Sequence, residues 1–229
     1  MTTNKDLAIK NIEQEFEKLS NLILEQLQLL DELFENRKAG KQGEIFERLI
    51  KNEKKIDKYE VKLDDSIIKT IVLYQPMASD LRRLFAIYHM TINLERVGDL
   101  VDRIACTFTE INDSEMLDEA ADTLHDMLKT TSKMVNRAIL SFINNDEEFA
   151  SWTLTKDASF DDMNQKLLKK SIKIAGLPKK SQDILNKLFD VRSIIASIER
   201  IGDHATNIAE ASVYAMSGSN IRHQDPTNE

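Results

Sequence analysis

The sequence contains few of the residues that interrupt helices or cross-link chains. Its 229 residues include one cysteine, three prolines and six glycines. The single cysteine, Cys106, excludes a disulfide framework and a zinc site built from cysteines, and it is typical of a protein from a reducing compartment. So few prolines and glycines in a chain of this length favour long helices over many short strands.

The sequence also lacks the usual features of membrane-spanning, secreted and nucleic-acid-binding proteins. No apolar run approaches the roughly 20 residues that cross a bilayer, and the N-terminal segment MTTNKDLAIKN is too polar for a signal peptide. The formal net charge of −8 opposes the binding of nucleic acid, which needs a basic surface. We therefore expect a cytoplasmic helical protein that is peripheral to a membrane at most.

Apolar residues recur at helical spacing in six long segments. Pro76 ends the second segment, because a proline disfavours helix at the residue before it, and Ser114 is a suitable N-cap for the fourth. From residue 218 to residue 229 no periodicity remains, which predicts a disordered tail. The six segments run from about 6 to 38, 44 to 74, 78 to 109, 115 to 143, 146 to 176 and 181 to 216.

The third and sixth segments share a motif, which indicates an internal duplication. Glu95-Arg96-Val97-Gly98-Asp99 recurs 104 residues later as Glu199-Arg200-Ile201-Gly202-Asp203. At the same offset, Leu84-Phe85 recurs as Leu188-Phe189 and Ile104-Ala105 recurs as Ile208-Ala209. We therefore predict an all-α fold of two three-helix repeats, the first over residues 1–111 and the second over 112–217.

Acidic residues stand where the second segment should be apolar. Leu49, Ile56 and Leu63 follow a helical seam, and the seam positions between them are Glu53 and Glu60. Asp57 flanks the same side, and the duplication repeats Glu53 and Asp57 as Asp157 and Asp161. A carboxylate on a buried stripe must meet a cation or remain protonated.

The repeat also predicts which acids face one another. If the second and third segments pack antiparallel around Pro76, residues equally far from it lie opposite each other, at an interhelix distance of roughly 8–10 Å. Oxygen ligands so placed suit Mg²⁺, Mn²⁺, Ca²⁺ or iron. The facing pairs in the first repeat are Asp57 with Glu95 and Glu53 with Asp99. In the second repeat the corresponding centre is Lys180, and the facing pairs are Asp161 with Glu199 and Asp157 with Asp203. All eight acids are candidate metal ligands.

Other observations bear on this prediction. Gly98 and Gly202 lie mid-helix, where glycine costs about 1 kcal/mol, so they predict a close approach by a neighbouring helix or an ion cluster. The competing interpretation is that each Glu-Arg forms an ion pair on a solvated face. Glu60 and Asp102 are peripheral, because Asn164 and Thr206 replace them at the offset of 104.

The histidines give weaker signals. His204, beside Asp203, is more readily a packing residue than a ligand, and Asp122-Thr123-Leu124-His125 only weakly resembles a metal-binding helix. No histidine follows a glutamate at the spacing that ferritin-type enzymes need. No acid–base or nucleophile constellation is present, which favours a regulatory adaptor; a metal-dependent enzyme or metal-storage protein remains the alternative.

Three stretches of the sequence resemble the PhoU family. The resemblance spans the chain from the first helix to the sixth and implies two tandem three-helix bundles. It also implies multinuclear iron or zinc clusters on paired E/D-x-x-x-D motifs, which fall on the eight acids named above. The stretches are Gln75-Pro76-Met77-Ala78-Ser79-Asp80-Leu81-Arg82-Arg83, Leu94-Glu95-Arg96-Val97-Gly98-Asp99 and Ile198-Glu199-Arg200-Ile201-Gly202-Asp203-His204-Ala205-Thr206-Asn207-Ile208-Ala209-Glu210.

The resemblance further implies a role in phosphate homeostasis. A PhoU-like chain is expected to be a cytoplasmic negative regulator of high-affinity phosphate uptake and phosphate-starvation signalling. The expected partners are a phosphate ABC transporter, a sensor histidine kinase and further copies of the chain, in homodimers or higher oligomers; another phosphate carrier is an alternative partner. The second repeat departs from the pattern, with Lys179-Lys180-Ser181-Gln182-Asp183-Ile184-Leu185 in place of the Gln75–Arg83 run. We expect Arg82 and Arg83 to dock on an acidic partner.

Overall fold

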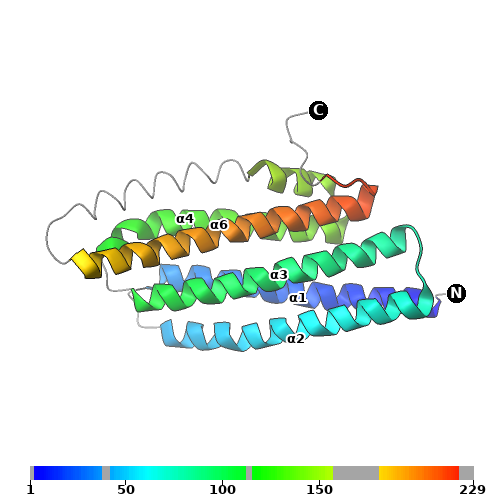
Figure 1. Ribbon diagram of the computed structural model, residues 1–229, viewed down its shortest axis with the longest axis horizontal. Coiled ribbons are helices and arrows are strands. Elements are labelled where there is room, and N and C mark those ends of the chain that lie inside the picture. The colour runs from blue at the N-terminus through cyan, green and yellow to red at the C-terminus, as the bar shows by residue number, and fades with distance from the viewer. Residues whose placement is uncertain (1–2, 38–41, 112–114, 157–180, 222–229) are drawn as a thin grey trace.

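The computed structural model describes residues 3–37, 42–111, 115–156 and 181–221, and within these ranges the secondary structure is helical, without strands (Figure 1). The predicted all-α fold is confirmed, and the described helix ends lie within about three residues of the predicted ones. The predicted fifth segment is helical over 147–156, and its remainder lies outside the described residues, as does Ser114. The helices are α1 (Asn4–Glu35), α2 (Gln42–Tyr74), α3 (Ser79–Glu110), α4 (Glu115–Asn144) and α6 (Ser181–Ser217).

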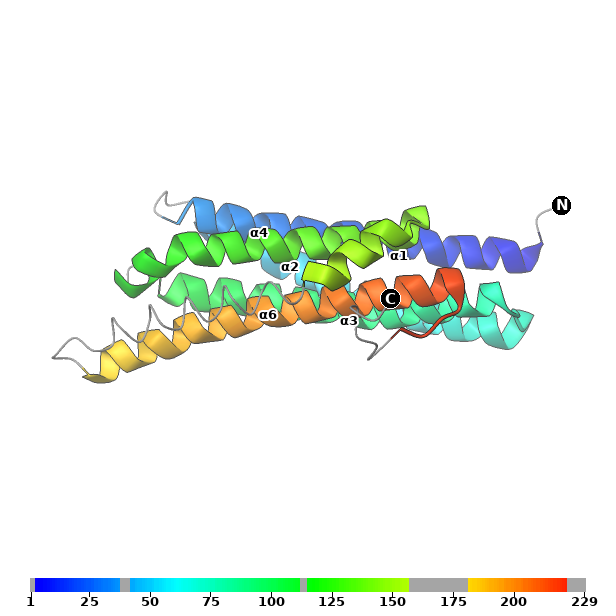
Figure 2. The same cartoon turned by 90° about the horizontal axis from the view of Figure 1, so that it is seen from above.

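The helices lie along a common long axis in two groups, as the two views show (Figures 1 and 2). Helices α1, α2 and α3 pack on one another, and α6 packs most extensively on α3 and α4. Helix α1 also contacts α4, so the two repeats meet side by side along their length. No helix in the described ranges combines the length and apolarity needed to cross a bilayer.

The core contains the seams that the sequence predicts. On α1, Phe16 and Phe34 are buried, and each ring packs on another helix. Phe16 meets Phe142 of α4 edge to face at 5.4 Å, and Phe34 stacks on Phe108 of α3 at 4.2 Å. Burial of each such side chain contributes about 1.5–3 kcal/mol, so these contacts hold α1 against both repeats. In the fourth of the predicted segments, which is α4, the residues at alternating spacings of four and three are all buried: Leu117, Ala121, Leu124, Leu128, Thr131, Val135, Ala138 and Phe142.

The turn between α2 and α3 fixes the register of the two helices. Helix α2 ends at Tyr74, and Gln75 takes a φ of 45° while its N–H donates to the Ile71 carbonyl at 3.0 Å, a common way to close a helix. Pro76 cannot continue the helix. Ala78 has a φ of 50° and directs the chain back into α3.

The structure gives Arg83 a different role from the docking role expected above. Its guanidinium forms an ion pair with Glu13 of α1 and donates to Asn145 Oδ1 at 3.0 Å. It also lies 4.3 Å from the centre of the Phe142 ring, close enough for a cation–π contact. Arg83 therefore ties α3 to α1 and to the end of α4, because its charge is engaged within the fold.

Candidate metal centre

The α2–α3 turn brings the predicted acids of the first repeat together. Glu53 and Asp57 project from α2, and Glu95 and Asp99 project from α3. Glu95 is only 9% exposed, Glu53 is half-buried, and Asp57 lies toward solvent. The cluster therefore lies between two antiparallel helices, with Glu95 buried and Asp57 open to water.

Burial and the neighbouring charges both act on these carboxylates. Burial, together with the charges of Asp57 and Asp99, raises the pKa of Glu53 to about 7. Burial likewise raises the pKa of Glu95 to about 7, helped mainly by the charge of Asp99. Near neutral pH each acid is thus balanced between its protonated and charged forms, and a cation would favour the charged form.

Two carboxylate oxygens in the cluster lack a hydrogen-bond partner in the described structure. They are Glu53 Oε2 and Glu95 Oε2, and both are buried. Arg96 supplies partial compensation: its Nη1 donates to Asp99 Oδ2 at 3.0 Å, and its Nε lies 3.4 Å from Glu95 Oε2 without hydrogen-bond geometry. Arg96 is 54% exposed, so water screens its charge. Buried, unpartnered anionic oxygens fit a bound cation.

Gly98 makes the close packing at this cluster possible. A Cβ at this position would lie 3.1 Å from Glu53 Oε2 and 3.1 Å from Ile56 Cδ1. The close approach predicted for Gly98 is therefore confirmed, and it involves both the acid and an apolar neighbour on α2. At Gly202, a Cβ would meet Thr131 Cγ2 of α4 at 3.6 Å, an ordinary packing contact.

Three further acids belong to the same charged network. The charge of Asp102 raises the pKa of Glu53, and that of Glu60 raises the pKa of Glu95. Asp102 Oδ1 and Asp64 Oδ1 are buried and lack a hydrogen-bond partner in the described structure. The sequence contained the signal for both α2 acids, since Glu60 lies on the seam that runs through Glu53, and Asp64 follows Glu60 by four residues on the same side of the helix.

The cluster fits metal ions in charge and chemistry. In the described structure, no three of the ligand atoms of the α2–α3 carboxylates lie within 4.8 Å of one another. Within the described ranges, three ligand atoms of His, Cys, Asp or Glu do come that close together at a different place. They belong to Asp31, Glu35 and His125. Metal binding here stays a prediction.

The second repeat is described only in part. On α6, Glu199 is partly buried and Asp203 is exposed, while Asp157 and Asp161 lie outside the described residues. The predicted second metal site therefore stays a prediction. His204 does act as a packing residue: its Nδ1 lies 2.9 Å from Asn93 Oδ1 of α3, which also accepts from Asn207 at 3.2 Å.

Comparisons with known proteins agree with this architecture. The family model described as "PhoU domain" matches residues 16–107 and again residues 124–212. A phosphate-specific transport system accessory protein PhoU homolog from Burkholderia sp. is 32% identical over 189 residues, which cover 79% of this chain and 76% of the relative. A homolog of the same description from Aquifex aeolicus is 30% identical over 215 residues, which cover 92% and 95%.

Solved structures show the same fold. The crystal structure of PhoU from Pseudomonas aeruginosa superimposes with a TM-score of 0.84 at 21% identity, covering 93% of this chain and 99% of that one. The phosphate transport system regulatory protein PhoU from Streptococcus pneumoniae gives a TM-score of 0.79 at 25% identity, covering 95% and 99%. The match of one family model to two successive segments confirms the internal duplication.

Proposed function

This chain belongs to the PhoU family, and from that premise we propose that it is a metal-binding regulatory adaptor of a phosphate-specific transport system. The observation that carries the proposal is the double family match, together with relatives that are accessory proteins of such systems. In this role the chain restrains high-affinity phosphate uptake and starvation signalling from the cytoplasmic side of the membrane. Its partners are the phosphate ABC transporter and a sensor histidine kinase, and it acts as a homodimer or higher oligomer.

The α2–α3 acids supply the metal-binding part of the proposal. Glu53, Asp57, Glu95 and Asp99 hold iron, zinc, manganese or magnesium ions, which supply the positive charge that the buried carboxylates lack. Ions bound there link α2 to α3 and fix the orientation of the turn between them. By the duplication, Asp157, Asp161, Glu199 and Asp203 hold ions in the second repeat.

The α2–α3 turn offers a surface for the transporter. With Arg83 engaged in the fold, large apolar side chains are accessible at this end of the hairpin: Leu73 is 71% exposed and Met77 is 79% exposed. Val72, directly before Leu73 in the last turn of α2, is 67% exposed. Exposed apolar side chains gathered at one end of a molecule are typical of a protein-binding site. Ions between α2 and α3 lie on the same hairpin, so metal loading and docking are linked.

A reporter strain tests the regulatory role. A starvation-induced promoter is measured at high phosphate in the parent, in a deletion strain, and in strains carrying Leu73→Glu/Met77→Glu or, as a control at the far end of α2, Ile50→Glu. We expect the promoter to stay active in the deletion strain and in the Leu73→Glu/Met77→Glu strain, and to be repressed with Ile50→Glu. Full repression in the deletion strain would remove the regulatory proposal; full repression with Leu73→Glu/Met77→Glu alone would remove only the docking surface.

The competing function is a metal-dependent enzyme or metal store on the same cluster. A hydrolase and oxidase screen of the metal-loaded protein, run beside a measurement of ions bound per chain, separates these functions. An adaptor binds a few ions and turns over no substrate. Turnover that disappears in Glu53→Gln/Glu95→Gln, or dozens of ions per chain, would favour the enzyme or the store.

A further inference from the structure

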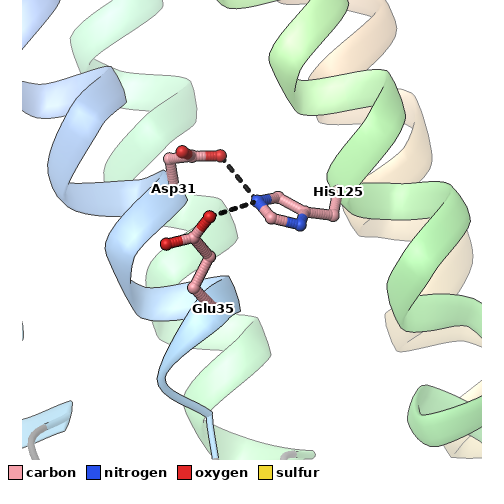
Figure 3. A group of neighbouring side chains, drawn as sticks. All are labelled: Asp31, Glu35 and His125. Carbon is pink, nitrogen blue, oxygen red and sulfur yellow. Dashed lines mark hydrogen bonds and ion pairs between the residues drawn. The ribbon is translucent and has the colours of Figure 1, made fainter.

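A second group of ligating side chains lies where the two repeats meet. Asp31 and Glu35 project from α1, and His125 projects from α4 between them (Figure 3). The His125 Nε2 atom lies 2.7 Å from Asp31 Oδ1 and 3.9 Å from Glu35 Oε1. Figure 3 shows that both carboxylates face this one ring nitrogen, while the other ring nitrogen is turned away.

A hydrogen bond alone accounts for only part of this geometry. An Nε2–H can donate to Asp31, but Glu35 at 3.9 Å lies beyond hydrogen-bond distance. A metal bound by nitrogen and carboxylate oxygen at about 2.0–2.2 Å keeps its ligand atoms roughly 3–3.5 Å apart. The two separations in the structure bracket that value, so small side-chain rotations would allow all three atoms to bind one ion.

The surroundings hold the ligands in place and admit water. Asp31 and Glu35 are four residues apart on α1, which places them on the same face of the helix. The His125 ring stacks on Phe34, with the ring centres 6.2 Å apart. Asp31 also lines an open groove of about 360 Å³ between α1 and α4, so water can complete the coordination of an ion. The nearest competing cation is Lys129, 3.6 Å from Glu35 Oε1 and half-exposed.

We propose that Asp31, Glu35 and His125 form a separate binding site for a divalent transition-metal ion such as Zn²⁺. One imidazole and two carboxylates, with positions left for water, make up a ligand set that suits Zn²⁺, Mn²⁺ or Fe²⁺ better than Mg²⁺ or Ca²⁺. The site differs in chemistry and location from the all-oxygen cluster between α2 and α3. An ion held here joins α1 of the first repeat to α4 of the second, and so fixes how the repeats sit against each other.

The imidazole nitrogens of the full-length chain provide a direct readout. The ¹⁵N resonances of the histidine side chains are followed by NMR while Zn²⁺ is added, in the parent and in Glu53→Gln/Glu95→Gln, which removes two of the acids of the α2–α3 cluster. We expect His125 to shift in both proteins at less than one equivalent of Zn²⁺, with His89 unchanged. A His125 resonance that does not move up to several equivalents of Zn²⁺ would overturn the proposal, whatever happens at the α2–α3 cluster.

Calorimetric titration of variants tests the ligand set. His125→Gln can keep a hydrogen bond to Asp31 but removes the imidazole, Glu35→Gln removes the most exposed ligand, and His89→Gln is the matched control. We expect Zn²⁺ binding at this site to weaken at least about tenfold in the first two, since even residues behind the direct ligands cost 10- to 100-fold. Unchanged affinity and stoichiometry in Glu35→Gln and His125→Gln would leave the group as an ion pair only.

Discussion

Replacing Glu53 and Glu95 by glutamine should stabilise the metal-free protein at neutral pH. Burial and repulsion raise the pKa of both acids to about 7. The folded protein therefore either keeps protons on them or loses stability when they become charged. Glutamine has nearly the shape of a protonated glutamate and carries no charge. The substitution therefore removes a repulsion that the folded state alone contains, and at the same time it removes two proposed metal ligands.

The sign and size follow from proton linkage. Between pH 4.5 and pH 7 the folded protein binds more protons at these acids than the unfolded chain does, so their contribution to stability falls as pH rises through this window. A rise in pKa of this size corresponds to roughly 3 kcal/mol for one isolated group. Because the two acids share part of the repulsion and water reaches Glu53, we expect about 2–4 kcal/mol for the pair.

The assay is urea unfolding with a chelator present, at several pH values from 5 to 8. The advantage of the double variant over the parent should be small near pH 5 and reach about 2–4 kcal/mol at pH 8. Glu47→Gln, at an exposed position on α2, is the control and should change neither curve. The lowered pKa of His204, caused by burial, acts in the opposite direction, but it is common to all three proteins and cancels in the differences. A double variant that is less stable than the parent at pH 8 would refute the reasoning.

Three further predictions concern the same molecule. Gly98→Ala should weaken metal binding between α2 and α3 in a calorimetric titration, since its Cβ would lie 3.1 Å from Glu53 Oε2; unchanged affinity would place the ion elsewhere. Arg83→Ala should lower the unfolding free energy by about 1–3 kcal/mol, because it removes the ion pair with Glu13 and the contact with the Phe142 ring. Arg103→Ala, at an exposed position, is the control and should have little effect. Equal effects of the two substitutions would contradict the role of Arg83 in holding α3 to α1 and α4. Chelation should lower the melting temperature, because an ion at 100 times its dissociation constant adds about 2.7 kcal/mol to the native state; an unchanged melting temperature would count against the ions.

The sequence predicted those features that depend on local spacing and one turn. Helical periodicity identified the buried face of α4, and the position of Pro76 set the register that brings Glu53 and Asp99 into one charged cluster. The internal repeat, by contrast, misled the assignment of Glu60 and Asp102. They were treated as peripheral because the second repeat lacks them; in the structure the charge of Asp102 contributes to the raised pKa of Glu53, and that of Glu60 to the raised pKa of Glu95.

Contacts between the repeats could not be predicted from the sequence. His125 was a weak signal beside Asp122, because periodicity within one helix contains no information about which helix lies opposite. Its partners come from α1, 94 residues away in the case of Asp31. The same limit applies to Arg83, which was expected to dock on a partner but instead contacts α1 and the end of α4.

The central claim is that the acids between α2 and α3 hold metal ions. Crystals of the protein loaded with iron, zinc or manganese, measured at the absorption edge of the metal, test it most directly. The account predicts anomalous density in the cleft, within about 2.0–2.6 Å of oxygens from Glu53, Asp57, Glu95 and Asp99. Clear density elsewhere in the molecule, with none between α2 and α3 for any of the three metals, would contradict it.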